Sequence, residues 1–191
     1  MRHFVYFSRH AQTSGNFKDL MQAGRMDIAI HTIIAGLFLS HGFREDTTVH
    51  LVFYGMPDPP KHIEIRIVPG LDISKKDVSN LIRKILYKYK EGKKTEVLPG
   101  CFVEKRSLLK VVEDLSKDGN EIFLLDKHGE DIRKAKIGDN CAFVLGDQTG
   151  IPQKEFKRLK KISTIVSTGP KTYFASHVVS VVNNELDRRR I

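Results

Sequence analysis

Three glycine-containing loops could together form a binding pocket. Each follows a short apolar segment typical of a buried strand, and the loops are 124–129 (LLDKHG), 145–150 (LGDQTG) and 167–172 (STGPKT). In an open α/β sheet, ligands bind outside the carboxyl ends of the strands, where such loops meet. Their backbone amides and carbonyls would suit an adenosine-type ligand. Each glycine taken singly is also explained by a tight turn, so the prediction rests on the three loops together.

Several other chemistries lack their motifs in this chain. There is no His-Glu-x-x-His metal motif, no Gly-x-Ser-x-Gly nucleophile elbow, and neither of the glycine-rich nucleotide loops, Walker A and Gly-x-Gly-x-x-Gly. The two cysteines, Cys101 and Cys141, form no Cys-x-x-Cys pair. We therefore expect no bound metal, and two buried thiols in a reducing compartment.

The charge balance indicates a class of partner. The formal net charge is +9 at pH 7, which favours nucleic acid. Lys and Arg cluster at 83–94, 154–161 and 188–190. Phosphate binding is one interpretation of these clusters, and solvated helix faces are the other.

The hydropathy pattern alternates between strands and helices. Expected strands are 3–8, 49–54, 62–68, 121–125, 142–145 and 163–166, and expected helices are 26–40, 74–90, 107–117 and 175–188. Ser74 and Asp77 have the spacing of a capping box, strand 62–68 alternates as a half-exposed strand does, and 91–100 is expected to be an exposed loop. Most strands lack strict alternation, so they are buried on both faces. The pattern predicts one α/β domain, 1–191, with a largely parallel sheet and helices on both faces.

Nothing in the pattern indicates a membrane protein. The first ten residues carry charges where a signal peptide would be apolar. The longest apolar stretch, 28–39, is far shorter than the roughly 20 residues that a membrane span needs. We expect a cytoplasmic protein with no membrane partner.

Six segments, in a fixed order, carry a family resemblance. They are 7–17 (FSRHAQTSGNF), 23–28 (AGRMDI), 36–46 (GLFLSHGFRED), 55–63 (GMPDPPKHI), 145–152 (LGDQTGIP) and 167–189 (STGPKTYFASHVVSVVNNELDRR). Together they closely resemble the archaeal tRNA pseudouridine-54 N1-methyltransferase family (TrmY) of the SPOUT superfamily. The Gly-Asp loop alone is a weak signal, whereas PDPP followed by ASH and NELDR is specific.

The resemblance implies a deep C-terminal trefoil knot that binds S-adenosylmethionine. The family's cofactor contacts, carried onto this chain, are Leu124, Gly146, Thr168, Gly169, Pro170, Lys171, Thr172, Tyr173 and Val178. Val178 stands where the family often has Cys, so we expect a backbone or apolar contact there. Lys171 and Thr172 replace a more usual Leu-Ser pair, which weakens any side-chain role at those positions.

The implied reaction is N1-methylation of pseudouridine at position 54 of tRNA. Pseudouridine is joined to ribose through carbon, so its N1 carries a proton that must leave as the methyl group arrives. We predict that Asp27 accepts or orients this proton, with its pKa raised by partial burial, while Arg25 holds a base carbonyl or a phosphate. The alternatives are a helix-stabilising carboxylate and a surface cation.

The sequence leaves two alternative functions open, and it also predicts how the chain assembles. The chain could instead methylate pseudouridine in ribosomal RNA, or be a non-catalytic RNA-binding module of the same fold. The resemblance implies a homodimer with active sites near the interface. The apolar stripe of helix 175–188 and the apolar stretch 28–39 agree with a homodimer, because one small domain does not readily cover both. A purely monomeric core is the alternative.

Overall fold

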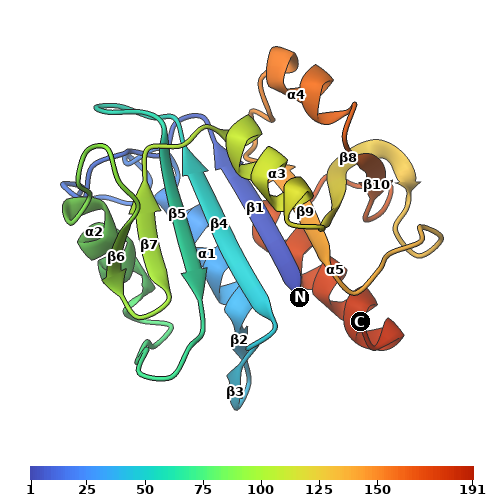
Figure 1. Cartoon of the computed structure of the whole chain (residues 1–191), viewed down its shortest axis with the longest axis horizontal. Coiled ribbons are helices and arrows are strands. Elements are labelled where there is room, and N and C mark those ends of the chain that lie inside the picture. The colour runs from blue at the N-terminus through green and yellow to red at the C-terminus, as the bar shows by residue number, and fades with distance from the viewer.

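Eight strands form one sheet in the order β10-β8-β9-β1-β4-β5-β7-β6 (Figure 1). The computed structural model describes residues 1–191. The strands are β1 (Arg2–Ser8), β4 (Thr47–Phe53), β5 (Lys61–Arg66), β6 (Thr95–Leu98), β7 (Cys101–Glu104), β8 (Glu121–Asp131), β9 (Cys141–Gly146) and β10 (Thr164–Ser167). Strands from β10 to β4 pair in parallel, and β5, β7 and β6 continue the sheet with antiparallel pairs.

Helices cover both faces of this sheet, so the predicted α/β class is confirmed. They are α1 (Met26–Leu37), α2 (Val78–Tyr87), α3 (Leu108–Lys117), α4 (Gln153–Leu159) and α5 (Ala175–Arg189), and a hairpin of β2 (Phe38–Leu39) and β3 (Gly42–Phe43) follows α1. On one face, α1, α2 and α5 enclose a core cluster of 35 buried residues. On the other face, α3 and α4 close a cluster of 12. None of these helices has the length and apolar character needed to cross a bilayer.

Strand β1 lies at the centre and sets the position of the site. Phe4 and Tyr6 pack into the larger core, Val5 and Phe7 into the smaller one, and all four are 0% exposed. Burying an apolar side chain of this size contributes roughly 1.5–3 kcal/mol. Because β1 pairs in parallel with both β9 and β4, the loops that follow these three strands emerge side by side at one edge.

Two predicted helix boundaries were wrong. The helix expected at 26–40 ends at Leu37, where the chain enters the β2–β3 hairpin. The capping box does not form: the Ser74 hydroxyl donates to the Asp77 carboxylate, and α2 begins at Val78 with no side-chain hydrogen bond to its first turn. The Ser74 hydroxyl therefore bonds the Asp77 side chain and caps no backbone amide of the helix.

Two regions were assigned too little structure. The expected loop 91–100 contains β6, which pairs with β7 at the sheet edge. Helix α4 was not predicted, because its segment is dense in Lys and Arg and buries only Leu159.

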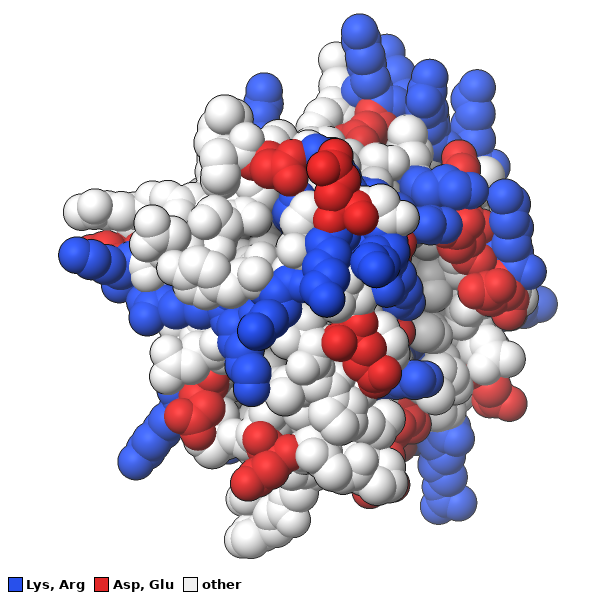
Figure 2. Space-filling model, turned by 60° about the vertical axis from the view of Figure 1, so that its left-hand side comes forward, with Lys and Arg blue, Asp and Glu red and all other residues white.

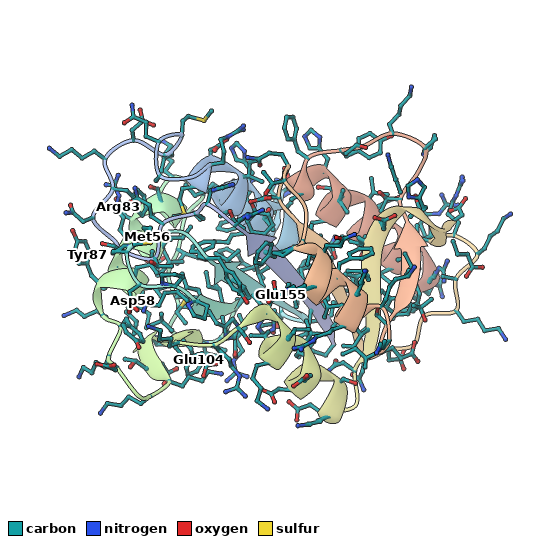
Figure 3. The ribbon with its side chains drawn as sticks, turned by 90° about the horizontal axis from the view of Figure 1, so that it is seen from above. Met56, Asp58, Arg83, Tyr87, Glu104 and Glu155 are labelled. Carbon is teal, nitrogen blue, oxygen red and sulfur yellow. The ribbon has the colours of Figure 1, made fainter.

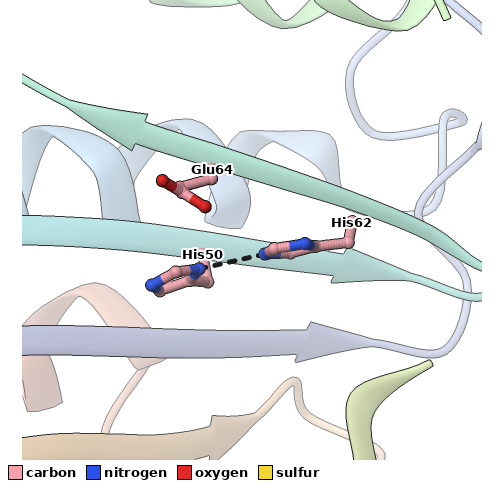
Figure 4. A group of neighbouring side chains, drawn as sticks. All are labelled: His50, His62 and Glu64. Carbon is pink, nitrogen blue, oxygen red and sulfur yellow. Dashed lines mark hydrogen bonds between the residues drawn. The ribbon is translucent and has the colours of Figure 1, made fainter. Parts of the chain in front are cut away.

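A row of polar side chains crosses the sheet on the face that α3 covers. His3 Nδ1 lies 3.0 Å from His50 Nε2. His50 Nδ1 lies 2.9 Å from His62 Nε2 (Figure 4). His62 Nδ1 is in turn 3.0 Å from Glu104 Oε1. These partners let His62 be buried, at 4% exposed, so strand β5 is not half-exposed as its alternation predicts.

Glu64 brings a carboxylate close to two of these histidines. One ligand atom from each of His50, His62 and Glu64 lies within 4.8 Å of the others, a spacing that could hold a metal ion. The two imidazole rings, however, are tilted by only 14° with centroids 5.2 Å apart, and their facing nitrogens share a hydrogen bond. In this hydrogen bond, the lone pair of one ring nitrogen points at the N–H group of the other ring, so that nitrogen does not point at a shared metal ion. The absence of a bound metal stays a prediction.

The buried histidines predict acid lability. Burial lowers the pKa of His3 to about 4, and burial, together with the charges of His62, His3 and Lys94, lowers the pKa of His50 well below 6.5. The unfolded chain therefore binds more protons below about pH 6.5, and the free energy of unfolding falls as the pH falls through this range. Each such histidine contributes a slope of at most about 1.4 kcal/mol per pH unit.

We expect His50→Gln to flatten this pH dependence, since it removes one titrating group from the row. Urea unfolding at pH 5 and pH 7.5 measures the change, with His41→Gln as the control because His41 is exposed. An unchanged slope in His50→Gln would contradict the assignment.

Candidate functional site

A cavity opens at the carboxyl ends of β9 and β10, beside the middle of β8. Its volume is about 720 Å³, within the range of small-molecule sites. All three predicted segments contribute to it, together with the start of α5. Segment 124–129, however, is part of β8 and is not a loop as predicted, because the strand continues beyond 125 to Asp131. Seven of the predicted cofactor-binding residues line it: Gly146, Thr168, Gly169, Lys171, Thr172, Tyr173 and Val178. The three segments thus converge on one cavity as the sequence predicts, although only 145–150 and 167–172 follow a strand as predicted.

Two of the predicted residues lie outside the cavity lining. Leu124 is 0% exposed and packs in the smaller core beside Leu108 and Val112 of α3, while its neighbour Leu125 lines the cavity. Successive side chains of a strand point to opposite faces, which explains why Leu125 lines the cavity and Leu124 does not. Pro170 is flanked by lining residues without being one. A contact of either residue with a cofactor stays a prediction.

Gly146 is required by its own loop. A Cβ at this position would lie 3.0 Å from the carbonyl carbon of Gly150 and from the amide nitrogen of Ile151. The chain therefore folds back over the end of β9, helped by Gly150 at φ +73°. The glycine thus keeps loop 147–151 against the cavity wall, in addition to leaving space for a ligand.

Asp147 connects this loop to the end of β1. One carboxylate oxygen accepts hydrogen bonds from the Thr149 amide (2.9 Å) and hydroxyl (2.6 Å). The other accepts from the Ser8 hydroxyl (3.0 Å) and the Arg9 amide (2.9 Å). One side chain therefore holds two strand-end loops in a fixed relation.

The predicted catalytic pair forms a two-point ion pair at the start of α1. Arg25 Nε and Nη2 each lie 3.0 Å from a carboxylate oxygen of Asp27. Arg25 adopts left-handed backbone angles, φ 63° and ψ 44°, which cost an L-residue roughly 1–2 kcal/mol. Such strain is concentrated at functional sites. Nothing in the sequence pattern could indicate it.

The expected shift of the Asp27 pKa was wrong. The hydrogen bonds from Arg25 lower the pKa of the Asp27 carboxyl, outweighing the opposing effect of partial burial. Asp27, with 22% of its side chain exposed, is therefore ionised but weakly basic. It is therefore suited to accept a hydrogen bond, and poorly suited to act as a general base that retains the proton.

Tyr6 is a site neighbour that the sequence reasoning missed. Its hydroxyl is buried without a hydrogen-bond partner, and burial followed by the charge of Asp147 raises its pKa. The charge of Asp27 raises the pKa of Tyr6 further, and the charge of Arg25 lowers it. The phenol therefore stays protonated beneath the site, with a hydrogen to donate. In the sequence, Tyr6 is one aromatic residue in an apolar strand, and nothing there indicates a buried hydroxyl close to the site.

The cavity has the chemical character that S-adenosylmethionine requires. Apolar side chains of Ile28, Leu145 and Ile151 offer walls for a planar base, and the glycine-rich loops offer backbone donors and acceptors. Asp126 and Lys127 add charged groups of both signs for a charged amino-acid moiety. These residues fit the cofactor that the resemblance implies.

The sequence matches a known family over its whole length. A profile of the family described as SAM-dependent RNA methyltransferase matches residues 1–191. The chain belongs to this family. It is 35% identical over 195 residues to the tRNA (pseudouridine(54)-N(1))-methyltransferase of Methanococcoides burtonii, covering 98% of this chain and 96% of that one. It is 36% identical over 197 residues to the enzyme of the same name from Thermococcus gammatolerans, covering 98% and 97%.

A solved structure shares the fold at low sequence identity. The crystal structure of Archaeoglobus fulgidus Nep1 bound to S-adenosylhomocysteine superposes with a TM-score of 0.61 at 15% identity. The match covers 98% of this chain and 97% of that chain. Since function depends on site residues more than on fold, this likeness supports the architecture alone.

Gly146→Leu should weaken cofactor binding. The added side chain would displace loop 147–151 and fill the cavity, so we expect affinity for S-adenosylmethionine to fall at least about tenfold, or about 1.4 kcal/mol. Calorimetric titration measures this. Gly42→Ala is the control, because a Cβ there meets nothing within 4 Å. Unchanged affinity in a folded Gly146→Leu variant would refute the assignment.

Proposed function

We propose that this protein transfers a methyl group from S-adenosylmethionine to N1 of pseudouridine 54 in tRNA. The observation that carries the proposal is the convergence of the three predicted segments on one cavity in a chain about 35% identical, from end to end, to enzymes named for this reaction. The cofactor supplies an activated methyl group when bound. Leu124, Pro170 and the seven residues that line the cavity are its proposed contacts.

The catalytic pair lies next to the cavity. Ile28 lines the cavity, and Asp27 precedes it at the start of α1. In the transfer, N1 gains a bond to the methyl carbon, the carbon–sulfur bond breaks, and the N1 proton leaves. Asp27 accepts a hydrogen bond from N1–H and so orients the nitrogen, while Arg25 keeps the carboxylate ionised. Because Asp27 is weakly basic, the proton passes onward to water.

The basic cluster on α4 is suited to a polyanionic substrate. The Lys and Arg side chains of 154–161 are exposed, and Ile151 and Phe156 beside them line the cavity. Arg83 and Arg189 serve the fold instead: Arg83 lies over Phe17, and Arg189 pairs with Glu185 and two backbone carbonyls. Figure 2 shows a face on which a band of Lys and Arg crosses the middle, with Asp and Glu above and below it. Of the three clusters, α4 therefore has the most direct access to the site.

A labelled-methyl assay tests the function against its alternatives. The protein is incubated with S-adenosylmethionine and one of three RNAs: tRNA with pseudouridine at position 54, the same tRNA with uridine there, or ribosomal RNA. We expect label only in the first. Label in ribosomal RNA alone would favour the sister activity, and label in none would favour a non-catalytic RNA-binding module.

Asp27→Asn tests the catalytic pair. The amide keeps the shape of the side chain but removes its charge, so single-turnover methylation should fall by about 10²–10⁴. Affinity for S-adenosylmethionine should change little. A folded variant that binds tRNA and methylates at the parent rate would leave Asp27 as a helix-stabilising residue only.

We also infer a homodimer that forms beside the cavity. Three large side chains just before and along α5 are exposed, Tyr173 (43%), Phe174 (57%) and Val181 (37%), and Tyr173 lines the cavity. Burying them in a second copy would place two active sites near one interface, as the resemblance implies. The larger core, with members from Phe4 to Leu186, supports a single SPOUT-type domain over 1–191, and its trefoil knot stays a prediction. Such a tRNA-modifying enzyme would act in the cytoplasm.

Light scattering tests the assembly. We expect a mass about twice the 21.8 kDa of one chain for the parent protein, and a shift toward one chain for Phe174→Asp, since an exposed carboxylate opposes burial of that surface. A monomer at micromolar concentration in the parent would contradict the dimer.

A further inference from the structure

A second cavity lies at the same edge of the sheet as the first. Its volume is about 670 Å³, close to that of the first. Its walls are the loops that follow β1 and β4, the turn before α1, and Pro152 before α4. Only two of its nine lining residues are hydrophobic, so it suits a polar ligand.

The walls of this cavity are fixed by backbone hydrogen bonds. The Gln12 amide donates to the Ala23 carbonyl (3.1 Å), and the Gly55 amide donates to the Ala11 carbonyl (3.0 Å). A Cβ on Gly24 would lie 1.8 Å from the His10 carbonyl oxygen, so only glycine allows this approach. Three loops distant in sequence thus make one preformed surface.

Tyr54 is also held in place at this surface. Its hydroxyl donates to Glu155 Oε1 at 2.7 Å and accepts from the Leu108 amide at 3.2 Å. Burial, followed by the hydrogen bond to Glu155, raises its pKa, so the phenol stays neutral. Figure 3 shows Glu155 on α4 and Met56 on the loop after β4. The ring therefore offers a rigid aromatic wall.

The second cavity adjoins the first without sharing a residue. Arg9 lines the second, and its amide binds Asp147, which lines the first. Ile151 and Pro152, adjacent in sequence, line one cavity each. A ligand in the second cavity would therefore lie one side-chain layer from the methyl donor.

The catalytic pair occupies the chain segment that joins the two cavities. Gly24 lines the second cavity and Ile28 lines the first. Arg25 and Asp27 lie between them in sequence. A proton acceptor is needed between the methyl donor and the nitrogen that receives the methyl group, and this segment lies between the two cavities.

The side chains that face the second cavity fit a ribonucleotide. The Arg9 guanidinium is exposed and makes no hydrogen bond or ion pair within the chain, so it is free to hold a phosphate. His10 and Gln22 are exposed beside it and can donate or accept hydrogen bonds. Met56 is 72% exposed and offers an apolar surface to a base.

From these observations we propose that the second cavity binds the RNA strand at the nucleotide to be methylated, with Arg9 on a backbone phosphate. This assignment rests on the proposed function and adds to it the residues that position the acceptor. Arg9 is a binding residue that acts through the RNA backbone, so its loss should weaken RNA binding without affecting the cofactor.

The test compares two charge-neutralising variants. Arg9→Gln removes the proposed phosphate contact. Lys117→Gln removes the same charge from the end of α3, an exposed position that precedes β8 and so lies toward the opposite edge of the sheet. For each variant, the affinity for pseudouridine-containing tRNA is measured at several salt concentrations, with the affinity for S-adenosylmethionine measured separately. Arg9→Lys is included because it keeps the charge.

We expect Arg9→Gln to weaken tRNA binding about tenfold and to reduce the slope of log affinity against log salt by about one. Arg9→Lys should restore the slope, Lys117→Gln should match the parent, and cofactor affinity should be equal in all. Equal tRNA affinity and slope in Arg9→Gln and Lys117→Gln would overturn the proposal. A parent protein that binds tRNA but methylates none would instead refute the proposed function and leave this binding result to be judged alone.

Discussion

The position of the site depends on the hydrogen bonds of one carboxylate, Asp147. Strands β9 and β1 are parallel neighbours, so their loops leave the sheet together, but adjacency alone does not fix their relative position. Asp147 supplies this constraint by accepting from Thr149 in its own loop and from Ser8 and Arg9 in the other. Loss of these bonds would release the loop that lines the first cavity from the loop that lines the second, so the proposed methyl donor and acceptor would lose their fixed relative position.

The two halves of the sheet meet different physical demands. The parallel half carries the cavities at its carboxyl edge, as open α/β sheets do. The antiparallel half, from β5 to β6, extends the sheet and carries part of the row of buried histidines. Burying a polar side chain costs stability unless it is hydrogen-bonded. His50 meets this condition through His3 and His62, and the row ends at Glu104. His62, which the alternation of strand 62–68 predicts to be exposed, is therefore part of the buried structure.

How far the sequence predicts the molecule depends on the range of the interactions involved. Apolar periodicity located β1 and α5 because burial follows local spacing. It missed β6 because an edge strand buries little, and α4 because its short basic segment covers the core mainly with Leu159. The convergence of the loops was predictable from strand ends, whereas the exchange of Leu124 for Leu125 required the strand's orientation. The left-handed backbone of Arg25 and the unpartnered hydroxyl of Tyr6 arise from long-range packing, which leaves no mark in local spacing.

The Arg25–Asp27 pair also constrains the chemistry. A general base works best with a pKa near the working pH, yet Arg25 lowers the pKa of Asp27. The structure thus favours a carboxylate that is always charged over one that retains the proton. In the proposed complex, a fixed negative charge beside N1–H would orient the nitrogen and stabilise positive charge that develops on it as the carbon–nitrogen bond forms. Proton loss can then follow to water, because 22% of the Asp27 side chain remains exposed. The strain at Arg25 is consistent with this role, since it holds the guanidinium where it keeps Asp27 ionised.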